Sequence, residues 1–296
     1  MTSCICNVHL AQLEQSLSLS KLRPRSRESY KERLITLSNH YRRCPAALTD
    51  DEILGYFVVC IEKKNHAAGT IRPAKAAVKF LFGRVLKRPT DFLDVIQLER
   101  RKKLPEIFSE ETAWRILDAT RLQHHRACMT LLYTCGLRIS EAINLTVDDF
   151  DRHRQEIRIR DGKGGKDRIV PIPTWTLNSL RNYWCTHRNP KWIFPALASM
   201  PELRESATAP MRASCVRDAL KAVLVQLEIP TKDIVLHTFR HSYATHLLDA
   251  GVSLYVIQRW LGHADLESTI IYLRLTHQGQ EKARKLVEGI MRGPRK

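Results

Sequence analysis

Several features that mark other classes of protein are missing from this sequence. It contains no run of about 18 apolar residues, so we expect no transmembrane helix. The first ten residues contain no basic segment of the kind that opens a secretory signal peptide. The sequence therefore predicts a protein that stays in the cytoplasm and has no membrane partner.

Cysteine pairs with the spacing of a structural zinc site are also missing. The chain has eight cysteines, but they are scattered, and no Cys-x-x-Cys pair occurs. Structural zinc sites usually take their ligands from such pairs. In a reducing compartment we expect these thiols to be small buried hydrophobic groups or inert surface groups. No metal or other cofactor is predicted.

Acidic residues are much less numerous than basic ones. The chain has 48 Lys and Arg against 31 Asp and Glu, a net charge of +17. Such an excess attracts polyanions, and nucleic acid is the commonest of these. The alternative is a basic surface that only maintains solubility. Both halves of the chain are basic, so we expect both to contact duplex DNA.

Helical periodicity covers the first hundred residues. Apolar positions recur at helical spacing over residues 26–41, 49–61 and 70–86. The second of these segments begins with Thr49 and three acidic residues, which is typical of a helix start. The outer face of the third segment carries candidate DNA contacts: Arg72, Lys75 and Lys79.

A run of charged residues closed by Pro105 interrupts this pattern. The run has few apolar side chains to bury, and we interpret it as an interdomain linker that lies near phosphate. The alternative is that these basic residues belong to a solvated helix end. The candidate DNA contacts of the run are Arg101, Lys102 and Lys103. The predicted organisation is a helical domain over residues 1–97, a linker over 98–105 and a second domain over 106–296.

The second domain is predicted to be mainly helical with a small β-hairpin. Residues 157–160 and 168–172 alternate between apolar and polar side chains, as strands do. A glycine-rich turn with Lys163 and Lys166 joins them. Residues 195–212 read as a loop, and 280–291 read as a C-terminal tail helix with one apolar stripe.

Four short segments carry side chains suited to phosphate chemistry. They are an arginine after a glycine, a lysine in the hairpin turn, a His-x-x-Arg segment, and a Gly-His pair followed nine residues later by a tyrosine. Each is weak evidence alone, because a tyrosine between apolar residues is usually a core aromatic. In chain order the candidate residues are Arg138, Lys163, His237, Arg240, His263 and Tyr272.

Together and in this order, these segments resemble the tyrosine recombinase family, which includes phage integrases, Xer-type recombinases and integron integrases. The specific motifs run from about residue 105 to 284, whereas the N-terminal part fits the family's SAM-like core-binding domain only in length and pattern. Thr238-Phe239 inside His-x-x-Arg is a conservative departure. The resemblance implies a two-domain clamp that closes around duplex DNA. It also implies a homotetramer on two duplexes, strand exchange through a Holliday junction, and a tail helix that packs on a neighbouring protomer.

The resemblance also implies a role for each candidate residue. Arg138 and Arg240 would bind the scissile phosphate, and Tyr272 would attack it to form a 3′-phosphotyrosyl link. Lys163 would protonate the leaving 5′-oxygen, with Lys166 as its rival on the same hairpin. In addition, His237 would help with proton transfer, and His263 would donate to the phosphate. Neither ATP nor a metal is needed, because the phosphotyrosine conserves the bond energy.

Helical geometry adds one requirement. His237 and Arg240 are three residues apart, so a helix places them on one face. His263 and Tyr272 are nine apart and would lie on opposite faces of one straight helix. They can share a site only if the chain breaks between them, and Asp265 could cap a new helix there. A metal site at His237, His241 and His246 is a weaker interpretation, because the Glu of a His-Glu-x-x-His motif is missing.

Glu141, one turn after Arg138, could orient that arginine or lie in solvent. Two further functions stay open at this point: DNA relaxation by a type IB topoisomerase, and DNA binding without catalysis on the same fold. DNA binding without catalysis would leave the tyrosine at position 272 unexplained.

The net charge of +17 leads to a first prediction. Each phosphate that the protein neutralises releases counterions, so binding to duplex DNA should weaken by well over tenfold between about 50 and 200 mM salt. Fluorescence anisotropy of a labelled duplex across that range measures it. A change of less than tenfold would contradict a broad basic DNA-binding surface.

Overall fold

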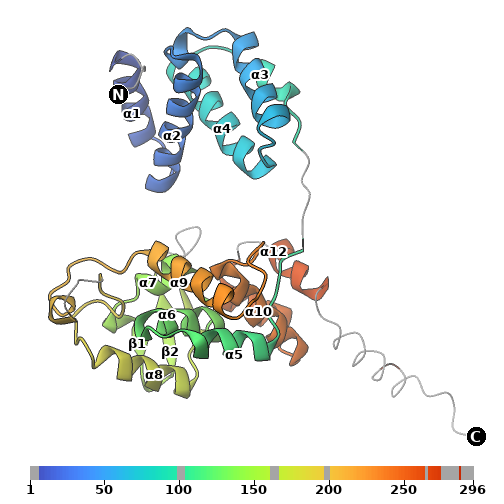
Figure 1. The fold of residues 1–296 in the computed structure, drawn as a ribbon. Helices are drawn as coiled ribbons and strands as arrows, with labels where there is room; N and C mark the ends of the chain where they lie inside the picture. The colour runs from blue at the N-terminus through green and yellow to red at the C-terminus, as the bar shows by residue number, and fades with distance from the viewer. Residues whose placement is uncertain are drawn as a thin grey trace, which may run out of the picture. The chain divides into compact units, whose positions relative to one another are not determined.

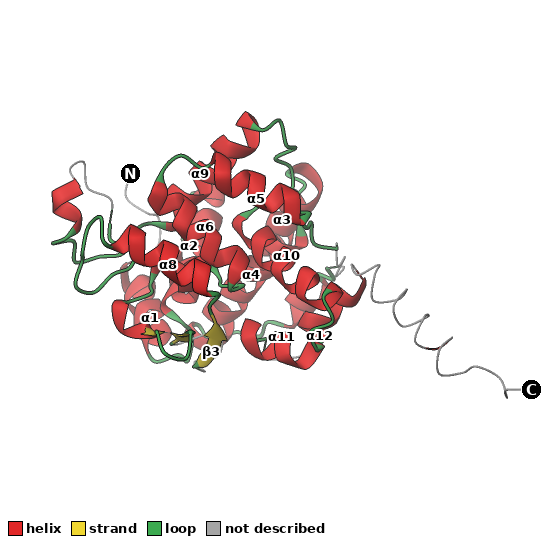
Figure 2. Cartoon of the chain, turned by 90° about the horizontal axis from the view of Figure 1, so that it is seen from below, coloured by secondary structure: helices red, strands yellow, loops and turns green. Residues whose placement is uncertain are grey.

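The computed structural model describes residues 7–98, 104–160, 167–196, 201–263, 266–274 and 287 (Figure 1). The chain divides into two compact units, Met1–Lys102 and Lys103–Lys296. Each has a hydrophobic core of its own. The predicted mainly helical fold with a small sheet is confirmed, and Figure 2 shows how little strand there is beside the helices.

The first unit is helical throughout its described part. Its helices are α1 (Asn7–Ser18), α2 (Pro24–Tyr41), α3 (Asp50–Val58) and α4 (Ala68–Phe80), with the short turns η1 (Pro45–Ala47), η2 (Val59–Lys63), η3 (Leu81–Val85) and η4 (Asp91–Val95). Thr49 caps α3 in a capping box with Glu52, which confirms the predicted start. α2 and α4 pack together over a core that includes Leu34, Phe57 and Phe82. α1 was not predicted from the sequence.

The described helices of the second unit surround α6, whose side chains are buried over most of its length. They are α5 (Glu110–Ala119), α6 (Gln123–Thr134), α7 (Ile139–Ile143), α8 (Thr174–Trp184), α9 (Ala213–Gln226), α10 (Leu236–Asp249), α11 (Leu254–Leu261) and α12 (Glu267–Ile270), with the 3-10 turns η5 (Val147–Asp149), η6 (Pro201–Arg204) and η7 (Ile271–Arg274). α10 packs on both α6 and η7. η7 contains Tyr272, the candidate nucleophile. The packing of α10 on η7 therefore joins Tyr272 to the core of this unit.

A three-stranded antiparallel sheet lies beside these helices. Its strands are β1 (Phe150–Asp151), β2 (Glu156–Ile159) and β3 (Arg168–Pro171), in the order β1-β2-β3, with Ile157 opposite Val170. The predicted hairpin is therefore confirmed, and β1 adds one short strand that was not predicted. The tip of the hairpin, with Lys163 and Lys166, lies outside the described residues.

The predicted chain break between His263 and Tyr272 is confirmed. α11 ends at Gly262, which has a left-handed φ of 63°. A Cβ at this position would lie 2.8 Å from Cδ of Arg168, so both the backbone and the packing favour glycine. The chain then turns through α12 into η7, which carries Tyr272. Asp265 lies outside the described residues, so its predicted capping role stays a prediction.

No helix in the described part of the chain is long and apolar enough to cross a membrane. The tail helix predicted over residues 280–291 lies outside the described residues, except for Val287.

Candidate active site

The carboxylate of Glu141 lies at the centre of a group of arginines. Arg138 precedes α7 and contacts Glu141 twice: its backbone N–H donates to Oε2 at 2.8 Å, and its Nη1 donates to Oε1 at 2.7 Å. Arg168 makes a bidentate contact, from Nη1 to Oε1 at 2.9 Å and from Nη2 to Oε2 at 2.7 Å. Nη1 of Arg240 lies 3.7 Å from Oε2. One carboxylate therefore faces three guanidiniums, and Glu141 is buried rather than solvated.

These contacts keep Glu141 ionised. Burial by itself would raise the pKa of its carboxyl, but the hydrogen bonds and charges of Arg168 and Arg138 outweigh burial and lower the pKa to about 2. The group is therefore a carboxylate at any pH at which the protein is folded and active. It can only accept hydrogen bonds, which fixes both arginines as donors.

Arg240 reaches this group from α10, and its side chain is wholly buried. Nη1 donates to the carbonyl of Gly136 at 2.7 Å, and Nη2 donates to the carbonyl of Leu261. Its Nε has no hydrogen-bond partner among the described residues. Burial first, and then the charge of Arg138, lower the pKa of Arg240 to about 9, which still leaves it charged at neutral pH.

Arg168 connects the sheet to the turn that carries His263. It is the first residue of β3, and its Nε donates to the carbonyl of Trp260 at 2.7 Å. Its other two nitrogens hold Glu141 on α7. One buried side chain therefore connects the hairpin, the start of α7 and the end of α11.

Tyr272 lies against the same group with 1% of its surface exposed. Its hydroxyl is 3.0 Å from Nδ1 of His241, and its ring stacks on that of His263 at a centroid distance of 6.3 Å. Nδ1 of His263 lies 2.9 Å from the hydroxyl of Thr269. Burial raises the pKa of Tyr272, although the charges of Arg240 and Arg138 act in the opposite direction. The resting tyrosine is a neutral phenol.

His237 is exposed near the start of α10. Its ring meets that of His241 edge to face, with centroids 4.5 Å apart. Desolvation of the ring, followed by His241, Arg240 and Arg138, lowers the pKa of His237. It is therefore a neutral imidazole at pH 7 and can accept or donate one hydrogen bond.

The structure thus brings five of the predicted residues together in one unit: Arg138, His237, Arg240, His263 and Tyr272. Lys163 lies outside the described residues, and so do Lys166, Arg101, Lys102 and Lys103. The remaining candidates belong to the first unit. There Lys75 and Lys79 lie 3.7 and 3.6 Å from Asp94, and Arg72 donates to the carbonyl of Leu98. No group of three or more His, Cys, Asp or Glu within the described residues is arranged to hold a metal ion.

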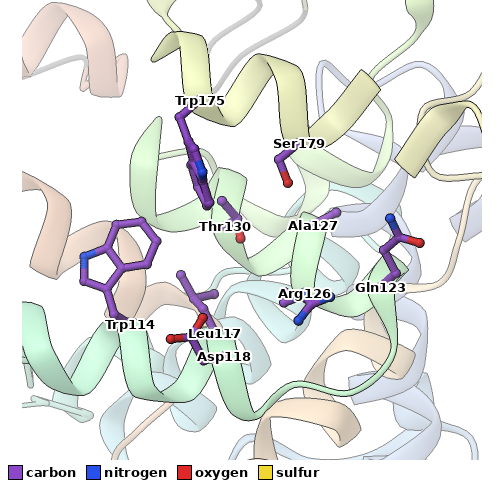
Figure 3. Close-up of a pocket in the computed structure, with 9 residues that line it drawn as sticks. All are labelled: Trp114, Leu117, Asp118, Gln123, Arg126, Ala127, Thr130, Trp175 and Ser179. Atoms are coloured by element: carbon purple, nitrogen blue, oxygen red, sulfur yellow. The ribbon is translucent and has the colours of Figure 1, made fainter. Parts of the chain in front are cut away.

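A separate hollow of about 250 Å³ lies between α5, α6 and α8 (Figure 3). Trp114 and Trp175 are among the residues that line it, and their rings meet edge to face with centroids 5.5 Å apart. None of the predicted catalytic residues lines it. The candidate active site is therefore the largely buried, charged cluster around Glu141, and this hollow is not part of it.

Comparison with known proteins agrees with this geometry. Residues 106–278 match the model of the phage integrase family, and residues 10–91 match its N-terminal SAM-like domain. The chain therefore belongs to the phage integrase family. It is a tyrosine-type site-specific recombinase, an enzyme that cleaves and rejoins DNA strands, as the sequence predicted.

Individual relatives support this. A Sinorhizobium fredii protein described as an integrase/recombinase is 34% identical over 248 residues, which cover 83% of this chain and 78% of that protein. The tyrosine recombinase XerA of Pyrococcus horikoshii is 32% identical over 197 residues, 65% of this chain and 66% of that one.

Solved structures of recombinases share the fold at lower identity. The Tn1549 transposon integrase, in complex with transposon right end DNA, has a TM-score of 0.66 and 19% identity, over 97% of this chain and 100% of that one. A lambda integrase dimer bound to a core site has a TM-score of 0.72 and 14% identity, over 90% and 94%.

Two residues of the recombinase site were missed by the sequence analysis, although signals for both were present. Arg168 shares the inward face of its strand with Val170 and Ile172, and a charge on an apolar face needs a buried partner. His241 is four residues after His237, so a helix brings the two rings close together. The sequence analysis considered it only as a metal ligand.

The buried contact between Arg168 and Glu141 leads to a second prediction. Arg168→Met removes the bidentate partner of Glu141 and leaves the buried carboxylate oxygens and the carbonyl of Trp260 without these donors. We expect the second unit to lose about 3 to 5 kcal/mol of unfolding free energy. All five tryptophans lie in this unit, so urea unfolding followed by tryptophan fluorescence reports on it selectively.

The matched control is Arg158→Met on the neighbouring strand. Arg158 is also paired, to Asp167 at 3.3 Å, but both side chains are exposed. An exposed pair contributes less than about 1 kcal/mol. Equal losses in the two variants would show that the buried contact is not what stabilises the site.

Proposed function

We propose that Tyr272 is the nucleophile of this recombinase and that Arg138 and Arg240 hold the phosphate it attacks. The observation that supports this most directly is the position of the Tyr272 ring, buried within the electrostatic reach of both guanidiniums of its own chain. Attack on a phosphodiester places extra negative charge on the nonbridging oxygens. Two guanidiniums stabilise that charge with bidentate geometry and do not lose their proton. Such preorganised charge is often the largest contribution to catalysis.

The other predicted residues take supporting roles in this proposal. Lys163 protonates the leaving 5′-oxygen, with Lys166 as the alternative. His237, which is exposed, assists proton transfer, and His263 donates to the phosphate. The product is a 3′-phosphotyrosyl link and a free 5′-hydroxyl. The reverse reaction rejoins a strand, with no cofactor.

We further propose how the chain assembles in the cytoplasm. Residues 1–97 form the core-binding domain, 98–105 the linker and 106–296 the catalytic domain, and the two domains clamp one duplex. Four protomers on two duplexes exchange strands through a Holliday junction, with each C-terminal tail helix packed on a neighbour. Support comes from the net charge of +17 and from the DNA-bound states in which the Tn1549 and lambda integrases were solved.

Covalent attachment to DNA tests the nucleophile and is the third prediction. A suicide substrate nicked beside the cleavage point should trap a protein–DNA band that survives denaturant, and it should do so in EDTA. Tyr272→Phe removes one oxygen and little volume, so this variant should fold and bind DNA but give no such band.

Tyr255→Phe is the control, because Tyr255 is 70% exposed on the neighbouring α11 and should be dispensable. A covalent band from Tyr272→Phe would place the nucleophile elsewhere. A strict requirement for magnesium would contradict the whole mechanism.

The fourth prediction tests the general acid. Lys163→Ala should slow cleavage of ordinary DNA about a hundredfold or more, the usual scale for this kind of catalysis. A substrate with a 5′-bridging phosphorothiolate has a leaving group that needs no proton, so the variant should cleave it at nearly the normal rate. Lys166→Ala is the matched control. If the phosphorothiolate substrate restored cleavage by Lys166→Ala but not by Lys163→Ala, the general acid would be Lys166 rather than Lys163.

A further inference from the structure

The proton of the attacking hydroxyl needs a destination, and the family resemblance left His237 with only a general part in proton transfer. The structure contains a more direct contact. Nδ1 of His241 on α10 lies 3.0 Å from the hydroxyl of Tyr272 on η7, between residues 31 positions apart in the chain. The rings are inclined, with centroids 5.6 Å apart.

The groups around the Tyr272 hydroxyl limit where its proton can go. Guanidiniums can only donate, so neither Arg240 nor Arg138 can accept the phenolic proton. The ring nitrogen of a neutral imidazole can. Burial, together with the charge of Arg240, lowers the pKa of His241 to about 4, so the ring is neutral at pH 7. When the ring proton is on Nε2, Nδ1 accepts the hydrogen bond from the Tyr272 hydroxyl, and in this arrangement the imidazole can take up the phenolic proton.

The other two histidines of the site are placed differently. Nδ1 of His263 is engaged with the hydroxyl of Thr269, and its ring lies nearly parallel to that of Tyr272, at 18°. His237 meets the ring of His241 and is exposed. Among the described residues, the hydrogen bond to the Tyr272 hydroxyl is made by His241.

We propose that His241 is the proton acceptor of the cleavage step, an inference that depends on Tyr272 being the nucleophile. As the Tyr272 oxygen forms its bond to phosphorus, its proton moves to Nδ1 of His241. The bond from phosphorus to the 5′-oxygen breaks, and that oxygen receives a proton from the general acid. In rejoining, the 5′-hydroxyl attacks and returns its proton to the general acid. Tyr272 then leaves the phosphorus and recovers its own proton from His241.

The charges that face His241 make this acceptor depend on DNA. In the free protein Arg240 opposes protonation of the ring, and His237 at 4.5 Å competes for any proton. A bound phosphodiester places negative charge against Arg240 and Arg138, and its charge grows in the transition state. That charge offsets the arginines, so the imidazolium becomes less costly at the moment when it forms.

Chemical rescue tests the proposal. His241→Ala should slow single-turnover cleavage of the suicide substrate about a hundredfold or more. Added imidazole should raise the cleavage rate of His241→Ala at least tenfold, because it can occupy the vacated space and accept the proton. The phosphorothiolate substrate should not restore it, since the defect lies at the nucleophile rather than the leaving group. His153→Ala, at an exposed position, should show neither the loss nor the rescue.

A second variant separates proton transfer from positioning. His241→Asn keeps a hydrogen-bond acceptor near the position of Nδ1 but cannot take up a proton. It should fold and bind DNA normally, as tryptophan fluorescence and anisotropy report, and still cleave about a hundredfold more slowly. Cleavage at the wild-type rate by His241→Asn or by His241→Ala would overturn the proposal. The hydrogen bond between His241 and Tyr272 would then belong only to the resting enzyme. A covalent band from Tyr272→Phe on the same substrate would instead show that the nucleophile is misassigned.

Discussion

One buried carboxylate, that of Glu141, makes the arrangement of positive charge in this recombinase stable. Three guanidiniums, from the start of α7, from β3 and from α10, lie within 4 Å of its oxygens. Without it they would repel one another where water is largely excluded and screening is weak. The same contacts join segments that are far apart in the sequence, so Glu141 sets both the charge and the geometry of the site.

In the free protein, Glu141 neutralises only part of the positive charge around it. One carboxylate does not neutralise three guanidiniums, and Nε of the buried Arg240 has no hydrogen-bond partner among the described residues. An unsatisfied buried donor costs about 1 to 3 kcal/mol, a cost that an arriving acceptor recovers. Phosphate oxygens are such acceptors. The net charge of +17 attracts DNA over a distance, whereas in the proposed mechanism this local excess would select the position of a single phosphate.

Local patterns in the sequence predicted the elements well but not the contacts between them. The capping box at Thr49, the alternation on both sides of the hairpin and the break after Gly262 each depend on neighbouring residues, and all three were predictable. Arg168 and His241 act through partners 27 and 31 residues away. No periodicity records such a pairing, so the first was taken for an ordinary strand residue. The second was considered only as a metal ligand, because a cluster of histidines has several chemical uses.

The resting state of Tyr272 shows why arginines alone would not activate it. Their charges lower the pKa of the phenol, but burial raises it by more, so the free protein keeps this proposed nucleophile protonated. A bound phosphate would oppose this activation further, because its negative charge cancels part of the field that favours the phenolate. A hydrogen-bonded base is not weakened in this way: the same phosphate makes protonation of His241 easier. Activation by a neighbouring imidazole therefore strengthens when substrate binds, whereas activation by fixed positive charge declines.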